Sequence, residues 1–119
     1  SSAASDVYKR QLQYRYVMHK LFDVPPGAFT PAPKVTSSIV RMVPKPEGKL
    51  LPVDWNVFSA LVAAAFQQRR KTMRNAISDF LDEEGFSEAG VPSTARAETL
   101  DVEAFVRLAN AAARRRQGA

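Results

Sequence analysis

The sequence predicts an α+β fold in which an antiparallel β-hairpin precedes a small all-α domain. Hydrophobic residues alternate with a period of two over residues 12–24, and residues 35–43 are rich in β-branched side chains. Over 53–119 the hydrophobic residues recur instead at helical spacing. Residues 44–52 separate the two patterns, and their proline-rich composition predicts a linker.

The first eleven residues are expected to lie outside the fold. Residues 1–11 show no hydrophobic periodicity, and residues 6–11 look like translated linker sequence, so we expect a non-native leader. From residue 12 the hydrophobic side chains fall on even positions, which predicts a half-buried strand. These side chains are Leu12, Tyr14, Tyr16, Met18, Phe22 and Val24, with Lys20 as the exception.

A proline-rich loop joins this strand to a second one. Pro25, Pro26 and Gly27 end the first strand, because proline cannot donate to a ladder and glycine allows a turn. In residues 35–43 the β-branched side chains occupy both faces, which is typical of a strand covered on both sides. Since a lone two-stranded hairpin is marginal in water, we expect the other strands of its sheet to lie outside this chain.

Helical spacing predicts the domain over 53–119. Asp54 is a suitable N-cap for its first helix. The apolar face of that helix is formed by Phe58, Leu61, Val62, Ala65 and Phe66. A second helix is expected to end at Gly85, and its apolar side is formed by Met73, Ile77, Phe80 and Leu81. A third helix begins after Asp101, and residues 114–116 are expected to fray.

Composition excludes several classes of function and favours one kind of partner. The absence of cysteine excludes disulfide scaffolds and thiolate chemistry, and a single histidine, His19, leaves little for a metal site. His19 beside Asp23 is expected to be a strand-surface pair rather than a catalytic base. No apolar run approaches the ~20 residues that span a bilayer, so no membrane partner is expected. Seventeen Lys and Arg against twelve Asp and Glu give a net charge of +5, which favours a polyanion such as a nucleic acid.

The densest chemical signal is a cationic block at residues 68–75, Gln-Arg-Arg-Lys-Thr-Met-Arg-Asn. At about 100° per residue on a continuous helix, Arg70, Lys71 and Arg74 share one side and Met73 points elsewhere. Guanidinium groups bind phosphate oxygens and amides can contact ribose or bases, so the mix suits an RNA or DNA backbone. The same charges equally fit a solvated helix face whose cations pair with the acidic residues at 79–84.

The second signal is Phe29, which the proline-rich loop holds between the two strands. An aromatic ring on a stiff loop can stack on an extruded base. The commoner role of such a ring is to plug the end of a core, and the residues alone favour that role. The isolated glycines form no phosphate-binding loop, and no serine lies in a nucleophile elbow, so no hydrolase or cofactor site is indicated.

Three blocks in this order resemble a known family. They are Leu-Phe-Asp-Val-Pro-Pro-Gly-Ala-Phe-Thr-Pro-Ala-Pro-Lys-Val within residues 21–41, Phe-Gln-Gln-Arg-Arg-Lys-Thr-Met-Arg-Asn at 66–75, and Arg-Ala-Glu-Thr-Leu at 96–100. Together they closely resemble the small-subunit ribosomal RNA adenine dimethyltransferases, the KsgA/RsmA family, from residue 12 to about residue 113. The resemblance implies that the hairpin is the last strand pair of a Rossmann-like class I methyltransferase sheet and that the helical domain helps to hold ribosomal RNA.

The resemblance also implies an activity and its residues. The family transfers methyl groups from S-adenosyl-L-methionine, without a metal, to N6 of two adjacent adenines of small-subunit ribosomal RNA during ribosome biogenesis. Carried over by position, Phe29 is the catalytic-site aromatic that packs against the flipped adenine, and Lys34 lies at the mouth of the active-site loop. The RNA-binding residues would be Lys34, Arg69, Arg70, Lys71, Arg74 and Asn75.

The family's glycine-rich cofactor loop, acidic ribose ligand and Asn-Leu-Pro-Tyr-like motif should precede residue 12, where the sequence has only the leader. We therefore expect a C-terminal fragment that is inactive alone, with S-adenosyl-L-methionine bound by the missing N-terminal part. The expected protein is a cytoplasmic monomer whose partner is ribosomal RNA of the small-subunit precursor. Two alternatives stay open: a large-subunit dimethyltransferase of the macrolide-resistance type, and a non-catalytic nucleic-acid-binding module like the related mitochondrial transcription factors.

Overall fold

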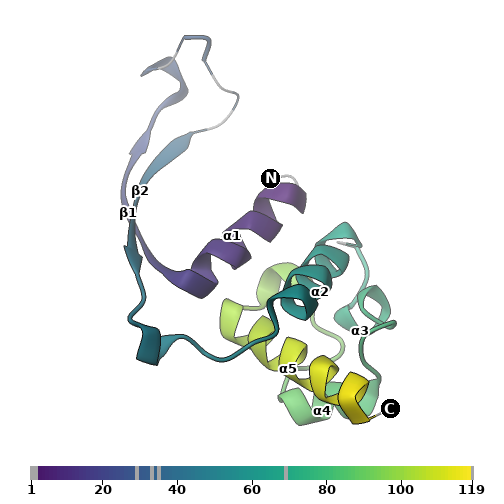
Figure 1. The fold of residues 1–119 in the computed structure, drawn as a ribbon. Coiled ribbons are helices and arrows are strands. Elements are labelled where there is room, and N and C mark those ends of the chain that lie inside the picture. The colour runs from purple at the N-terminus through teal and green to yellow at the C-terminus, as the bar shows by residue number, and fades with distance from the viewer. Residues whose placement is uncertain (1–2, 29, 33, 35, 69, 119) are drawn as a thin grey trace.

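A β-hairpin projects from a bundle of helices in the computed structural model, which describes residues 3–28, 30–32, 34, 36–68 and 70–118 (Figure 1). The order is α1 (Ala3–Arg15), β1 (Tyr16–Val24), β2 (Ser37–Pro44), α2 (Trp55–Gln67), α3 (Met73–Ala76), α4 (Glu83–Ala89) and α5 (Val102–Gly118). Short 3-10 turns cover Pro26–Ala28, Glu47–Lys49 and Ala97–Thr99. The radius of gyration is 16.2 Å, larger than the roughly 13.5 Å of a compact domain of this length, because the hairpin extends outwards. The predicted α+β class is confirmed.

The bundle buries the apolar faces that the helical spacing predicts. Asp54 caps α2, since its carboxylate accepts hydrogen bonds from the backbone N–H groups of Asn56 at 3.0 Å and Val57 at 3.2 Å. All five predicted face residues of α2 are at most 1% exposed. Among the described residues the whole buried core lies between Val57 and Ala112, so α2 to α5 form one hydrophobic unit.

The second predicted helix is wrong in its extent. The chain forms two short helices, α3 and α4, because Asp82 starts a new helix by accepting a hydrogen bond from the N–H of Gly85 at 3.0 Å. Gly85 therefore lies inside α4, and the helix ends instead at Gly90, whose φ of 68° is left-handed. The apolar side is still buried, with Ile77 at 0% exposure.

The end of α5 is ordered rather than frayed. Its first turn is capped by Asp101, which accepts a hydrogen bond from the N–H of Ala104 at 2.9 Å. The helix includes residues 114–116, and Arg115 Nη2 lies 2.6 Å from the carboxylate of Asp82. This ion pair links the last turns of α5 to the N-cap residue of α4.

The first strand begins four residues later than the alternation predicts. Residues 12–15 belong to α1, which packs against α2 and α5, so the strand prediction is wrong for this stretch. Tyr14 lies among the rings of the bundle rather than in a sheet. The predicted leader, residues 1–11, is thus partly helical here, with Arg10 donating to the carbonyl of Leu100 at 3.1 Å. Burial lowers the pKa of the Arg10 guanidinium.

A β-bulge in β1 changes the face on which the residues after it lie, and the alternation of apolar residues does not reveal this change. β1 and β2 pair antiparallel, with Met18 opposite Met42, but the register shifts between Lys20 and Phe22. Because of that shift, Phe22 lies on the face opposite to Met18, so the predicted single apolar face of β1 is wrong. Asp23 pairs with Lys20 at 2.8 Å instead of with His19, which corrects the expected surface pair. Hydrogen bonds from Lys20 and from Ser38 lower the pKa of Asp23.

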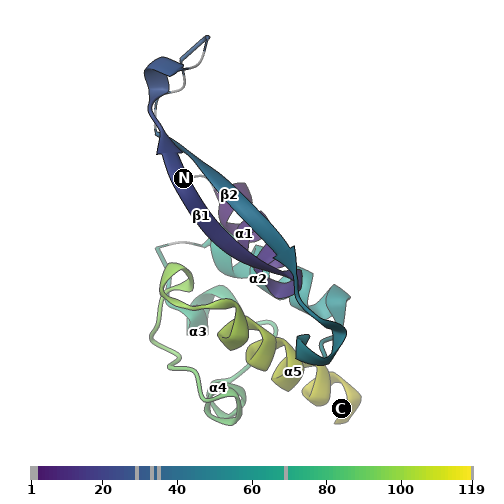
Figure 2. The ribbon, with the colours of Figure 1, turned by 90° about the vertical axis from the view of Figure 1, so that its left-hand side faces the viewer.

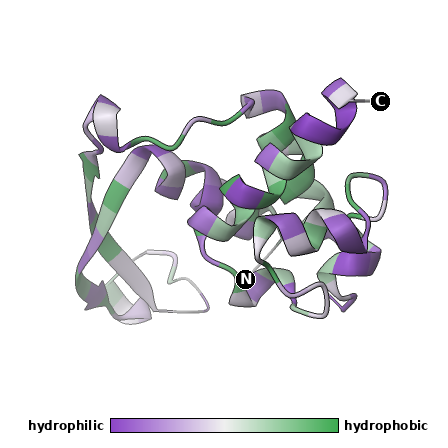
Figure 3. Ribbon diagram, turned by 90° about the horizontal axis from the view of Figure 1, so that it is seen from below, coloured by the Kyte–Doolittle hydropathy of each residue, from purple (hydrophilic) through white to green (hydrophobic). Residues whose placement is uncertain are grey.

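Both faces of the hairpin carry exposed apolar side chains. Phe22 is 57% exposed, while Ile39 and Met42 are each 41% exposed. Apolar residues therefore appear in the strands as well as in the bundle interior (Figure 3). The hairpin therefore has no hydrophobic core of its own. Exposed apolar side chains on both faces are typical of a strand pair that other elements of a larger sheet cover.

A junction cluster of Tyr14, Arg15, Trp55 and Phe58 connects α1 to the start of α2. The ring centroid of Phe58 lies 5.5 Å from those of Tyr14 and Trp55, and the Arg15 guanidinium lies 5.1 Å from the Trp55 ring. The segment 44–52, predicted as a linker, is held beside this cluster. Three hydrogen bonds fix it: Lys45 N to Arg15 O at 2.9 Å, Tyr14 Oη to Leu51 O, and Asn110 Nδ2 to Pro52 O at 3.0 Å.

Candidate nucleic-acid interface

The cationic block forms a turn between two helices, not a stripe on one helix. α2 ends at Gln67, and Gln68 leaves helical geometry with φ −113° and ψ 54°. The N–H of Lys71 donates to the carbonyl of Gln68 at 2.9 Å, which closes the turn before α3 begins at Met73. The prediction of one continuous helix face for Arg70, Lys71 and Arg74 is therefore wrong.

Hydrogen bonds to the loop at residues 91–96 hold the backbone of the turn in place. Met73 N donates to Ala95 O at 2.7 Å, and Arg74 N donates to Ser93 O at 2.9 Å. The guanidinium of Arg96 donates to the carbonyl of Arg70. The Met73 side chain is fully buried, so both its backbone and its side chain fix the position of the turn. We call residues 70–75 the cationic turn.

The cationic turn keeps its charged side chains and Asn75 in solvent, while Met73 enters the core and the Thr72 hydroxyl oxygen is buried. Arg70, Lys71, Arg74 and Asn75 are exposed. Within the part of the chain that the structure describes, Arg70 and Lys71 have no ion pair. Both side chains are therefore available to an external anion. The solvated-face interpretation instead predicts that they pair with acidic residues of the same chain.

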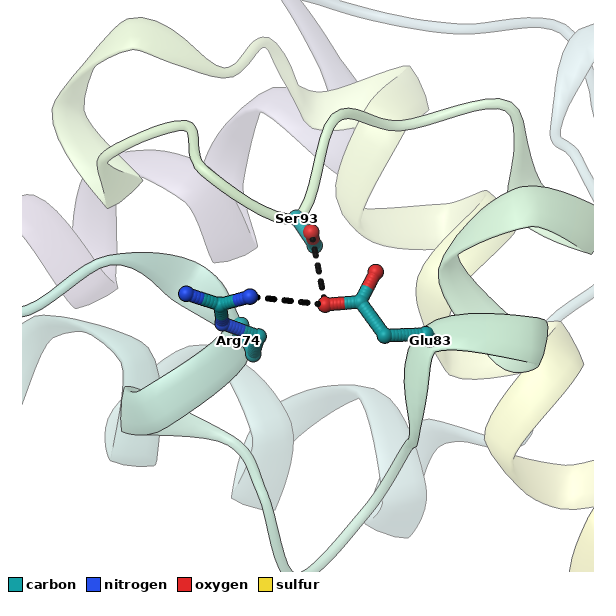
Figure 4. Close-up of polar contacts among 3 residues, drawn as sticks. All are labelled: Arg74, Glu83 and Ser93. Atoms are coloured by element: carbon teal, nitrogen blue, oxygen red, sulfur yellow. Dashed lines mark hydrogen bonds and ion pairs between the residues drawn. The ribbon is translucent and has the colours of Figure 1, made fainter.

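Arg74 does form an ion pair, as the solvated-face interpretation expects. Its Nη1 lies 3.2 Å from Oε1 of Glu83, and Ser93 Oγ donates to the same oxygen at 3.0 Å (Figure 4). The Arg74 and Glu83 side chains are 53% and 61% exposed, so solvent screens the pair. One guanidinium nitrogen is engaged, and its other N–H donors face no described partner.

The predicted site residues divide into two groups in space. One group is Arg70 and Lys71, which lie just before α3, together with Arg74 and Asn75, which lie within it. Lys34 is exposed and follows β1 in the connection to β2. The two strands carry this connection away from the helical bundle that contains α3 (Figures 1 and 2). Phe29 and Arg69 lie outside the described residues. The sequence interpretation missed the contributions of Ser93 and Arg96, which reach the turn only through contacts distant along the chain.

No metal centre is found among the described residues, where no group of three or more His, Asp or Glu side chains comes together. None of the described helices has the length and apolarity needed to cross a membrane. A cleft of about 570 Å³ lies between α1, β1 and the start of α5. Its walls carry both cations, Lys9 and Lys45, and acids, Glu98 and Glu103, so it favours a polyanion less than the cationic turn does.

Two solved structures share the fold of this chain. The crystal structure of the 23S rRNA methyltransferase ErmE matches 90% of this chain and 46% of its own, with a TM-score of 0.62 and 19% identity. A dimethyladenosine transferase from Plasmodium falciparum matches 87% of this chain and 47% of its own, with a TM-score of 0.54 and 17% identity. These likenesses place the chain in a fold that methyltransferases of this class contain.

Sequence comparison identifies the family. Residues 11–114 match the model of the family described as ribosomal RNA adenine dimethylase, and the chain belongs to this family. A protein of Aromatoleum aromaticum named ribosomal RNA small subunit methyltransferase A is 54% identical over 99 residues, covering 83% of this chain and 37% of that protein. A Burkholderia thailandensis protein of the same name is 49% identical over 107 residues, covering 90% and 39%. The chain thus spans about two fifths of the length of these relatives. The resemblance predicted from the three sequence blocks is confirmed.

Proposed function

We propose that this chain is the RNA-gripping C-terminal part of an S-adenosyl-L-methionine-dependent enzyme that dimethylates N6 of two adjacent adenines in small-subunit ribosomal RNA. Family membership and the names of the relatives support the reaction class and the subunit. The observation that carries the proposal in the structure is the cationic turn, whose exposed cations stand on a backbone pinned by three hydrogen bonds.

In this proposal the cationic turn binds the RNA backbone. Arg70, Lys71 and Arg74 contact phosphate oxygens, and Asn75 contacts ribose or a base edge. Arg69 belongs to the same group by its place in the sequence. The phosphate contacts carry no sequence information themselves, and they set the orientation of the RNA relative to the hairpin.

The hairpin loop serves the reacting base. Phe29 stacks on the flipped adenine, and Lys34, which is exposed at the loop, contacts the neighbouring backbone. Replacing Phe29 with alanine in an enzyme that carries the whole family sequence is expected to lower turnover more than RNA affinity. Unchanged methylation would remove the stacking role.

The cofactor belongs to another part of the protein. The five glycines of this chain are isolated and the described clefts are open, so these residues do not fit S-adenosyl-L-methionine. We propose that the exposed faces of the hairpin complete a Rossmann-like methyltransferase sheet whose other strands hold the methyl donor. The chain alone is then inactive.

The partner is ribosomal RNA of the small-subunit precursor, bound by a monomer in the compartment where ribosomes are assembled, which in bacteria is the cytoplasm. No single feature of the described surface favours the other two candidates. A large-subunit enzyme is tested by the choice of RNA, and a non-catalytic module is tested by methyl transfer in the enzyme with its complete sequence.

The salt dependence of RNA binding tests whether the cationic turn contacts RNA phosphates. The 119-residue chain is titrated against a fluorescent fragment of the 3′ region of small-subunit ribosomal RNA, with a large-subunit fragment as competitor. Alanine at both Arg70 and Arg74 should weaken binding and reduce the slope of log affinity against log salt by about 1.4–1.8, since each lost phosphate contact removes roughly 0.7–0.9. Lys49→Ala is the matched control, because Lys49 is an exposed cation on a separate turn. A double variant with the wild-type slope returns both arginines to the solvated-face interpretation.

A further inference from the structure

Arg74, Ser93 and Glu83 form a closed ring of hydrogen bonds between three segments of the bundle (Figure 4). The backbone N–H of Arg74 donates to Ser93 O at 2.9 Å. Ser93 Oγ donates to Glu83 Oε1 at 3.0 Å, and Arg74 Nη1 donates to the same Oε1 at 3.2 Å. Arg74 is therefore held at both its backbone and its guanidinium, which distinguishes it from an arginine in a simple surface ion pair.

Glu83 is held in place by contacts other than its ion pair with Arg74. It is the first residue of α4, directly after the N-cap Asp82, where the helix dipole favours a negative side chain. The Ser93 hydroxyl also restrains the Glu83 carboxylate by donating to its Oε1. A restrained carboxylate is a directional acceptor, so it selects an orientation of the guanidinium rather than following it.

The ring leaves most of the Arg74 guanidinium available. An arginine has five N–H donors, and the ring uses one nitrogen, Nη1. A free arginine side chain loses much rotamer freedom when it binds a phosphate, and a side chain that is already oriented loses less. Preorganisation of Arg74 should therefore raise its affinity for a phosphate oxygen, although the carboxylate adds negative charge nearby.

We propose that Glu83 is a positioning residue that orients Arg74 for a phosphate of the bound RNA. This inference rests on the proposed function, because it assigns a role to a group that contacts RNA through Arg74. Charge alone predicts the opposite sign for its removal, since deleting an acid from an RNA-binding surface strengthens the attraction to RNA. The two explanations can therefore be separated by the direction of one change.

The test measures RNA affinity of the 119-residue chain by fluorescence anisotropy with the small-subunit fragment. Glu83→Ala should weaken binding by about 1.5- to 5-fold, the range that corresponds to an exposed ion pair. Glu83→Gln keeps an oxygen that accepts from Ser93 and Arg74, so it should restore at least half of the lost affinity. Glu84→Ala is the matched control, because Glu84 is exposed on the same helix turn and has no ion pair to another described residue. It should leave binding unchanged or slightly stronger.

A double-mutant cycle separates positioning from a change of fold. In the Arg74→Ala background, Glu83→Ala should not weaken binding further and should leave the affinity unchanged or slightly higher, as Glu84→Ala does; the unfolding temperature of each variant is measured alongside. If Glu83→Ala lowers folding, Ser93→Ala supplies a second variant, which should weaken binding in the same direction by loosening Glu83. Weakened binding of Arg74→Ala together with unchanged or tighter binding of Glu83→Ala overturns the role of Glu83 alone. Unchanged binding of Arg74→Ala overturns the proposed RNA contact itself.

Discussion

The junction cluster should contribute measurable stability to the link between the hairpin and the bundle. Trp55→Ala removes ring contacts with Tyr14 at 5.9 Å and with Phe58 at 5.5 Å, and it removes the Arg15 guanidinium contact at 5.1 Å. Aromatic pairs contribute about 0.5–1.5 kcal/mol each, and an exposed cation–π contact contributes about 0.5–1 kcal/mol. Because Trp55 is 37% exposed, we expect a loss of about 1.5–4 kcal/mol in the free energy of unfolding, with the lower half of that range favoured by its solvent contact.

Urea denaturation followed by far-ultraviolet circular dichroism measures this loss, since helices supply most of the signal. Tyr8→Ala is the control, because Tyr8 is 65% exposed and lies outside the cluster, and it should change the free energy of unfolding by less than about 0.5 kcal/mol. Trp55→Phe keeps a ring against Phe58 and should lose less than Trp55→Ala. A loss below about 0.5 kcal/mol for Trp55→Ala would refute the packing of this cluster and, with it, a fixed attachment of the hairpin.

Two further predictions concern the caps of α4 and α5. Asp101→Ala removes the acceptor of the Ala104 N–H and should cost about 1 kcal/mol of unfolding free energy in urea melts, whereas Asp101→Asn keeps the acceptor and should cost far less; equal costs would contradict the cap. The hydrogen bond from the Gly85 N–H lowers the pKa of Asp82, and the ion pair with Arg115 lowers it further. A lowered folded-state pKa gives stability that is complete above the ordinary carboxyl pKa and is lost as the pH falls through the folded value, so the difference in unfolding temperature between wild type and Asp82→Asn should shrink from pH 6 to pH 3. A constant difference across that range would contradict it.

Local patterns in the sequence predict those features that depend on neighbouring residues. The α2 face and the Asp54 cap follow from spacings of three and four residues and from one side chain that bonds to the next turn. The end of β1 at Val24 follows from the prolines directly after it. In each case the interacting groups are close along the chain, so a pattern in the sequence contains the information.

Features that depend on pairing between distant residues could not be predicted in this way. The bulge at residue 21 is defined by the pairing of β1 with β2, and it moves Phe22 to the opposite face of the hairpin. The alternation of apolar residues along the sequence is the same with or without the bulge, so it cannot reveal this change. The turn that follows Gln67 is held by the backbone N–H groups of Met73 and Arg74, which donate to the carbonyls of Ala95 and Ser93 about twenty residues further on. The sequence pattern leaves open whether a break separates the first two helical stretches, and it places Arg70, Lys71 and Arg74 on one helix side, whereas tertiary contacts form a turn there.

The two interpretations of the cationic block are compatible once the geometry is considered. The solvated-face interpretation requires partners for the cations of the block, and the bundle supplies one for Arg74 through Glu83, whereas Asp82 pairs with Arg115 of α5 instead. Arg70 and Lys71 keep no described acidic partner, although four acids lie within the next fourteen residues. Since the 91–96 loop fixes the backbone of the turn without neutralising these two side chains, the turn keeps a positive charge at a defined place. A surface selected only for solubility does not require a backbone pinned by three long-range hydrogen bonds beneath unpaired cations, whereas a phosphate-binding surface benefits from both.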